Sequence, residues 1–82
     1  MNKMHEEQAI KAGWKAAQAA NPFRVQNLLE LEGIVADAMM DRLAEMRVED
    51  EWEGDTFWEV ALDVAETVYG TGTLLEVLNR NR

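Results

Sequence analysis

Cysteine and serine are both absent from this chain of 82 residues, and histidine occurs once, at His5. Without cysteine the chain forms no disulfide, no thiolate metal site and no thiol nucleophile. Without serine as well, the usual pairs of nucleophile and histidine cannot be assembled. One imidazole is too few for a histidine-based metal site. We therefore expect a protein that is not an enzyme and that holds no metal and no other cofactor.

Long apolar runs are also missing. No stretch approaches the roughly 18–20 consecutive apolar residues that span a bilayer. The apolar core of an export signal is missing from the first residues, MNKMHEE. The chain shows no tract of low complexity and no repeat of roughly 20–50 residues. We expect one soluble helical domain over residues 1–82, located in the cytoplasm.

Positive charge is scarce in this chain. Sixteen acidic residues against eight basic ones give a net charge of −8. Residues 30–76 hold fourteen acids against two bases, Arg42 and Arg47, a net of −12. Such a field repels nucleic-acid phosphates and anionic membranes, and it attracts a basic protein surface. We expect no direct contact with nucleic acid or membrane. The alternative is that the charge only keeps a small protein in solution.

Apolar residues make up 48% of the chain and recur at helical spacing. A first helix is predicted over about residues 3–20, where the alanine-rich composition favours helix. A third is predicted from about residue 55 to Tyr69, where Gly70 is suited to end it. A short fourth helix is predicted after residue 73. The last two helices each begin at a capping box, Thr56 with Glu59 and Thr73 with Glu76. We predict an all-α fold, a small bundle of three to four helices.

The second predicted helix runs from Pro22 to about Val48, with Asn21 as its N-cap. Its 27 residues would span roughly 40 Å, which is long for so small a domain. We therefore predict a second helix that is either long or bent at Gly33. Glu32 and Arg42 interrupt its apolar face. A break at Gly33 would turn Glu32 away from that face, and the alternative is that both charges meet partner groups. The apolar face consists of Val25, Leu28, Leu31, Val35, Met39, Leu43 and Met46.

Carboxylates gather on the opposite side of this helix and in the segment that follows it. Asp37, Asp41 and Glu45 succeed one another at i+4 positions, and residues 49–55 read EDEWEGD. That segment does not fit an EF-hand, because the position that should supply a bidentate glutamate is Val60. Acid–base chemistry needs carboxylates that converge in a cleft. We expect a solvated acidic face and not an active site.

Aromatic residues exceed what one small core requires. The apolar residues of the third helix cover more than half of its circumference, whereas packing on one core needs a stripe of roughly 100°. Trp and Tyr often anchor protein interfaces. Core filling accounts for Trp14 and Phe57 but not for Trp52, because five acidic neighbours hold Trp52 close to water. The predicted partner-binding residues are Asp37, Asp41, Glu45, Glu49, Asp50, Glu51, Trp52, Glu53 and Trp58.

Together these features favour a non-catalytic module that binds another protein with a basic surface through an aromatic patch and an acidic face. Small acidic proteins of this style are common among inhibitors and adaptors, including those that phages direct against host factors. Two alternatives stay open. One is a nucleic-acid mimic, because carboxylates one helical turn apart are separated by roughly 5–6 Å, near the spacing of successive phosphates along one DNA strand. The other is a structural homo-oligomer, such as a homodimer, formed through the third helix.

Overall fold

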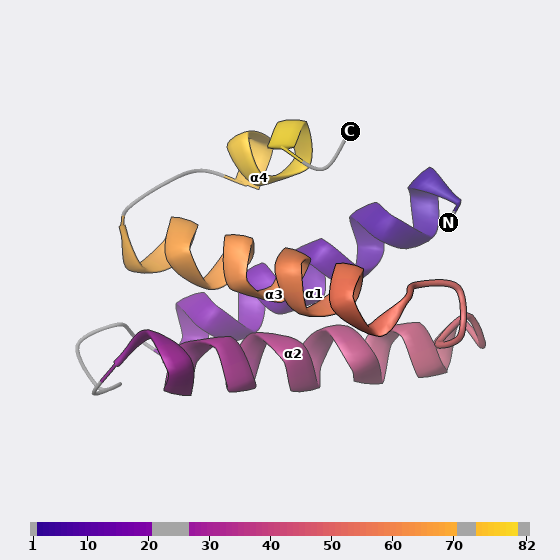
Figure 1. Ribbon diagram of the computed structural model, residues 1–82, viewed down its shortest axis with the longest axis horizontal. Coiled ribbons are helices and arrows are strands. Elements are labelled where there is room, and N and C mark those ends of the chain that lie inside the picture. Colours follow the sequence, from indigo (N-terminus) through magenta and orange to yellow (C-terminus); the bar gives the residue numbers. More distant parts are fainter. Residues whose placement is uncertain (1, 21–26, 71–73, 81–82) are drawn as a thin grey trace.

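The computed structural model describes residues 2–20, 27–70 and 74–80. Within these ranges the chain forms a bundle of helices without strands, which confirms the all-α prediction. Consecutive long helices run antiparallel, with α2 beside α3 and α1 behind both, while α4 lies over α3 (Figure 1). None of the helices in these ranges is long and apolar enough to cross a membrane. The helices are α1 (Lys3–Ala20), α2 (Leu28–Glu45), α3 (Gly54–Tyr69) and α4 (Leu74–Arg80).

The core lies where all four helices meet and is apolar throughout. Helix α3 contacts each of the other three helices, whereas α2 and α4 do not touch within the described ranges. This arrangement accounts for most of the wide apolar surface of α3, because three neighbours bury it from different sides. The largest fully buried side chains are Ile10, Leu31, Val35, Met39, Leu43, Val60, Val64 and Val77.

Helix α1 has the predicted bounds, and its small residues bring it close to α2. A Cβ atom on Gly13 would lie 2.9 Å from both Met39 Cγ and Val35 Cγ1, closer than ordinary contact allows. Ala9 and Ala17, one turn before and one turn after Gly13, are also fully buried. Glycine and alanine therefore let α1 approach α2 closely, in addition to favouring the helix.

Helix α2 begins later than predicted, at Leu28 and not at Pro22. Asn27 has extended backbone dihedrals, with φ −161° and ψ 168°, and so stands outside the helix as its N-cap. Its side-chain oxygen accepts a hydrogen bond of 2.8 Å from the Glu30 amide. The predicted cap at Asn21 lies outside the described residues.

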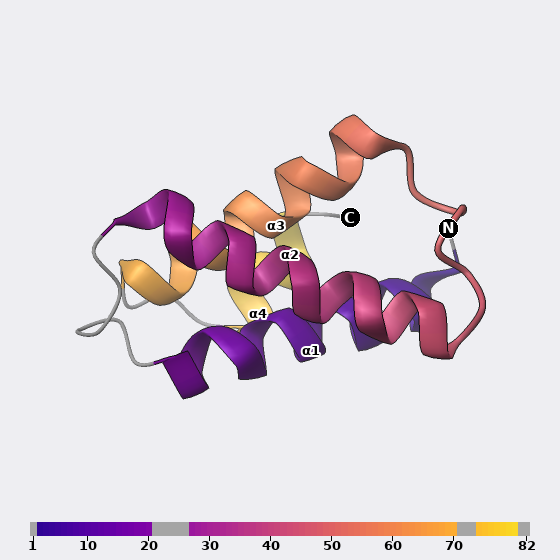
Figure 2. The same ribbon diagram turned by 90° about the horizontal axis from the view of Figure 1, so that it is seen from below.

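The end and the middle of α2 also differ from the prediction. The helix ends at Glu45 because Arg47 adopts a left-handed backbone with φ 59°. The Val48 amide then donates to the Leu43 carbonyl at 2.9 Å, which closes a Schellman-type helix end. The helix continues through Gly33 as one element (Figure 2). Of the two alternatives, a long helix or one interrupted at Gly33, the described helix is uninterrupted at Gly33 and, at 18 residues, shorter than the 27 predicted.

Because α2 is unbroken, Glu32 and Arg42 both stay on its apolar side, and Arg42 is accommodated there by contacts. Arg42 donates from Nη2 to Gln8 Oε1 of α1 at 3.4 Å and from Nη1 to Glu45 Oε2 at 3.2 Å. Glu32 is half-buried. Both guanidinium contacts are made within the chain, and Arg42 is thereby directed toward α1.

Substituting Arg47 by glycine should raise the free energy of unfolding by about 0.5–1 kcal/mol. A left-handed conformation costs a non-glycine residue about 1–2 kcal/mol, and the extra freedom of glycine in the unfolded chain takes back about 0.4–1 kcal/mol of that gain. Urea unfolding followed by circular dichroism measures the change. Arg47→Ala removes the same charge but keeps the Cβ atom, and we expect it to leave stability unchanged. Equal effects of the two substitutions would contradict the backbone explanation.

Helix α3 begins at Gly54 with Glu53 as its N-cap residue, so the predicted capping box at Thr56 is wrong. Thr56 is exposed in the first turn of the helix. The predicted end at Tyr69 is confirmed, and the Gly70 amide donates to the Glu66 carbonyl at 2.8 Å. The second predicted capping residue, Thr73, lies outside the described residues.

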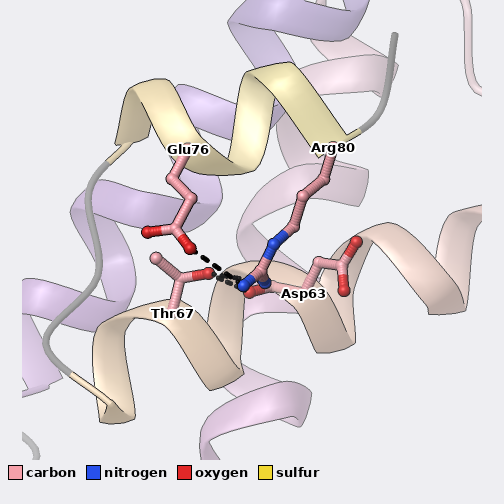
Figure 3. Close-up of polar contacts among 4 residues, drawn as sticks. All are labelled: Asp63, Thr67, Glu76 and Arg80. Atoms are coloured by element: carbon pink, nitrogen blue, oxygen red, sulfur yellow. Dashed lines mark hydrogen bonds and ion pairs between the residues drawn. The ribbon is translucent and has the colours of Figure 1, made fainter.

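Helix α4 is held over α3 and α1 by apolar and polar contacts. Val77 of α4 is fully buried. Arg80 donates from Nη1 to Thr67 Oγ1 of α3 at 3.4 Å and from Nη2 to Glu76 Oε1 at 3.0 Å (Figure 3). The buried Thr67 hydroxyl donates in turn to the Asp63 carbonyl at 2.7 Å. The chain thus covers the groove between α1 and α3 with its own last helix.

Candidate functional site

Large exposed apolar side chains concentrate on α2 and α3. Two on α2, Leu29 and Met40, are eleven residues apart, and so are Trp58 and Tyr69 on α3. Eleven residues make about three helical turns, so each pair lies along one line on its helix. The exposed fractions are 74% for Leu29, 40% for Met40, 51% for Trp58 and 48% for Tyr69.

The line of exposed apolar residues on α2, Leu29 and Met40, lies next to α3. Val35 marks the side of α2 that faces α1, because it lies against Gly13. Met40 is about 140° further round the helix at about 100° per residue. The surface between Val35 and Met40 is buried, through residues that include Leu43 and Ala36. Since α1 and α3 are the only described helices that contact α2, this buried surface leads to α3.

The line of exposed apolar residues on α3, Trp58 and Tyr69, lies next to α2, for a similar reason. Thr67 marks the side of α3 that faces α4, through its contact with Arg80. From Thr67 the buried surface passes round the helix to Ala61 and ends at the line of Trp58 and Tyr69. Helix α4 has no contact with α2, so the far edge of this buried surface is the one beside α2.

The two lines therefore run next to each other on the outer side of the α2–α3 pair, away from α1. The half-buried Leu62 lies one turn after Trp58 and extends the α3 line. The first turn of α2 lies beside the last turn of α3 because the two helices are antiparallel (Figure 1). Leu29 in that first turn is therefore on the same end of the pair as Tyr69, and Met40 is toward the end of Trp58. We call this surface the α2–α3 seam and define it as Leu29, Met40, Trp58, Leu62 and Tyr69.

Carboxylates border the seam on both sides. Further round each helix, beyond the apolar line, the exposed charged residues are all acidic. Helix α3 contains no lysine or arginine, and the one base of α2, Arg42, is directed toward α1. The seam is thus an apolar stripe between two negative edges. The bordering residues are Glu30, Asp37 and Asp41 on α2 and Asp55, Glu59 and Glu66 on α3.

The structure distributes the predicted acidic residues over two regions. Asp37 and Asp41 belong to the edge of the seam, whereas Glu45 pairs with Arg42 at the end of α2. The other four predicted carboxylates lie in the segment between α2 and α3 and are exposed. One of them, Glu51, has its Oε2 atom 3.5 Å from His5 Nδ1. Within the described ranges no three histidine, aspartate or glutamate residues are arranged to hold a metal ion. The four carboxylates between α2 and α3 are Glu49, Asp50, Glu51 and Glu53.

The predicted aromatic residues differ from each other in burial. Trp52 is half-buried against the core, with its ring centroid 6.3 Å from that of Phe57. Phe57 also meets Trp58 edge-on, at a centroid distance of 5.6 Å and an interplanar angle of 80°. The acidic neighbours of Trp52 therefore do not keep it at the surface. The exposed indole of the seam belongs to Trp58.

Four residues of the seam are absent from the predicted site, namely Leu29, Met40, Leu62 and Tyr69. The signal that marks them is the spacing of eleven residues on two helices combined with their position outside the buried face. These residues can be recognised as one surface only when the bounds of each helix and its neighbouring helices are known.

Comparison with known proteins gives no relative from which a function could be transferred. No family model, no curated protein and no solved structure matches the chain. The function is therefore inferred from the surface of the molecule itself.

Proposed function

We propose that this protein is a non-catalytic binding module, an inhibitor or an adaptor, that docks on another protein through the α2–α3 seam. The observation that carries the proposal is the half-exposed Trp58, which meets the buried Phe57 edge-on and lies on a surface with other exposed apolar side chains. Tryptophan, tyrosine and methionine are enriched at the centres of protein interfaces, which have polar rims. The seam has both features, an apolar centre and a rim of carboxylates.

The proposal predicts that Trp58 is an anchor of the interface. Truncation of such an aromatic anchor costs about 2–4 kcal/mol of binding free energy, and every 1.4 kcal/mol is about tenfold in affinity. We expect Trp58→Ala and Met40→Gln to lose proteins that the wild-type chain captures from a lysate of its own cells. Quantitative mass spectrometry of the captured proteins measures this.

Leu75→Ala is the matched control, because Leu75 is 64% exposed on α4 and lies outside the seam. This variant should keep every protein that the wild type captures, and circular dichroism should show intact helices for all variants. The proposal is wrong if the seam variants retain the same proteins as the wild type, or if Leu75→Ala loses them equally.

A nucleic-acid mimic is a second candidate, supported by exposed acidic residues that form no ion pair within the described part of the chain. Asp37 and Asp41 are exposed and form no ion pair within the described ranges, and Glu49 and Asp50 extend the negative surface beyond α2. Such a surface would occupy the basic groove of a nucleic-acid-binding protein. Binding of that kind would weaken steeply with added salt and would not require Trp58, whereas docking through the seam requires the Trp58 anchor.

A homo-oligomer built through the seam is opposed by charge. A symmetric dimer would place the acidic edges of both copies against each other, and neither α2 nor α3 has a base there to neutralise them. We therefore propose a monomer in the absence of its partner. Light scattering at increasing concentration tests this, and a stable dimer would favour the structural alternative.

A further inference from the structure

The dimensions of the seam limit the kind of element that covers it. Leu29 to Met40 and Trp58 to Tyr69 each extend about 16 Å along their helices at 1.5 Å per residue. This is about half of the longest dimension of the molecule, 33 Å. The described part of the chain encloses no cavity, whereas small ligands need a concave pocket that surrounds most of their surface. The seam therefore suits an elongated element three to four helical turns long.

Two helices that lie side by side can pack a third helix against both of them, because the side-chain ridges of one helix fit the grooves on the surface of another. The protein itself shows this on its other side, where α4 packs against both α1 and α3 and contributes Leu74, Val77 and Leu78 to the core. No described helix covers the α2–α3 seam in this way. The same geometry that admits α4 admits a helix from outside.

The charge on the two edges specifies the rest of that helix. Both edges of the seam are acidic, so a helix lying along it places its flanking residues near carboxylates on either side. Acidic flanks would be repelled, and like charges facing each other across an interface cost several kcal/mol. A second copy of this chain offers no suitable helix, because its lysines, Lys3, Lys11 and Lys15, all lie on α1, whose apolar face is already buried.

The geometry points to a partner that presents a cationic amphipathic helix of three to four turns, with one apolar stripe flanked on both sides by lysine or arginine. Its apolar side chains lie between the α2 and α3 lines and contact Trp58 and Met40. Its basic residues face Asp37 and Asp41 on one side and Glu59 and Glu66 on the other. This inference rests on the proposed function and names the class of partner for the same surface.

The experiment uses three synthetic helical peptides of equal length and measures their binding to the full chain by calorimetry. The first carries a leucine stripe flanked by lysines, the second carries the same stripe flanked by glutamates, and the third has the composition of the first in scrambled order. We expect the first peptide to bind and the second to bind at least about 100-fold more weakly, given the cost of facing like charges. The scrambled peptide should also bind weakly, because its leucines do not form a stripe.

Variants of the protein place the peptide on the seam. Trp58→Ala should weaken the lysine-flanked peptide at least about 30-fold, the loss expected for an aromatic anchor. The double variant Glu59→Gln/Glu66→Gln should weaken it about tenfold, because exposed ion pairs contribute roughly 0.2–1 kcal/mol each. The matched control Glu49→Gln/Asp50→Asn removes two charges outside the seam and should have a much smaller effect.

The outcomes separate this inference from the proposed function. If both flanked peptides bind equally and Trp58→Ala weakens both, the seam docks proteins but the inferred charge of the partner is wrong. If binding of the lysine-flanked peptide is insensitive to Trp58→Ala, or falls equally in the two double variants, the seam is not its site. Absence of binding by the lysine-flanked peptide, or a dimer that Trp58→Ala dissociates, also overturns the inference.

Discussion

Replacing Phe57 with alanine should lower the free energy of unfolding by about 3–5 kcal/mol, a large part of the stability of a small domain. Phe57 is 6% exposed and contacts the rings of both Trp52 and Trp58. Its removal leaves a cavity in the core and ends two aromatic contacts, each worth about 0.5–1.5 kcal/mol. Urea unfolding followed by circular dichroism measures the loss.

The neighbouring residue supplies the control. Trp58→Ala should cost only about 1–2 kcal/mol, because half of the indole is already in water and burial contributes roughly 25 cal/mol per Å². Equal losses at the two positions would show that Trp58 is a core residue and would remove the anchor of the seam. The expected difference means that stability and binding can be changed separately, by substitutions at adjacent positions.

Alanine at Gly13 and alanine at Gly33 should change the free energy of unfolding in opposite directions. At Gly13 the new Cβ atom would lie 2.9 Å from Met39 Cγ and Val35 Cγ1. Overpacking of this kind costs about 1–3 kcal/mol, which exceeds the gain of about 1 kcal/mol from better helix propensity. At Gly33 no atom lies within 4 Å of the new Cβ atom, so the gain of about 0.5–1 kcal/mol remains.

Gly13→Val extends the comparison. The β-branched side chain places two further carbons into the same contact between α1 and α2, so we expect the largest loss of the three variants, beyond the about 1–3 kcal/mol of a typical overpacked core. Thermal and urea unfolding of all three variants measure the order Gly33→Ala, wild type, Gly13→Ala, Gly13→Val in decreasing stability. A stabilising effect of Gly13→Ala would show that α1 and α2 are not in close contact at Gly13.

Which helix ends could be predicted depends on how many local solutions the sequence offers. The bounds of α1 and the end of α3 at Gly70 follow from composition and from one suitable cap, and both are confirmed. At the start of α2 two asparagines, Asn21 and Asn27, precede apolar residues, and the described helix begins after the second. Its end is marked by Arg47 in a left-handed conformation. Sequence patterns associate that conformation with glycine, so they placed the end too late.

The sequence by itself determined the all-α class and the approximate positions of the helices, because these follow from spacing within a few turns. The partial burial of Trp52 was decided by the tertiary structure, since its ring packs beside Phe57 despite its acidic neighbours. The tertiary structure also determined that the α2–α3 seam exists. Its halves, residues 29–40 and 58–69, become one surface because α2 and α3 pack antiparallel, and no local pattern encodes which sides of two helices face the same way.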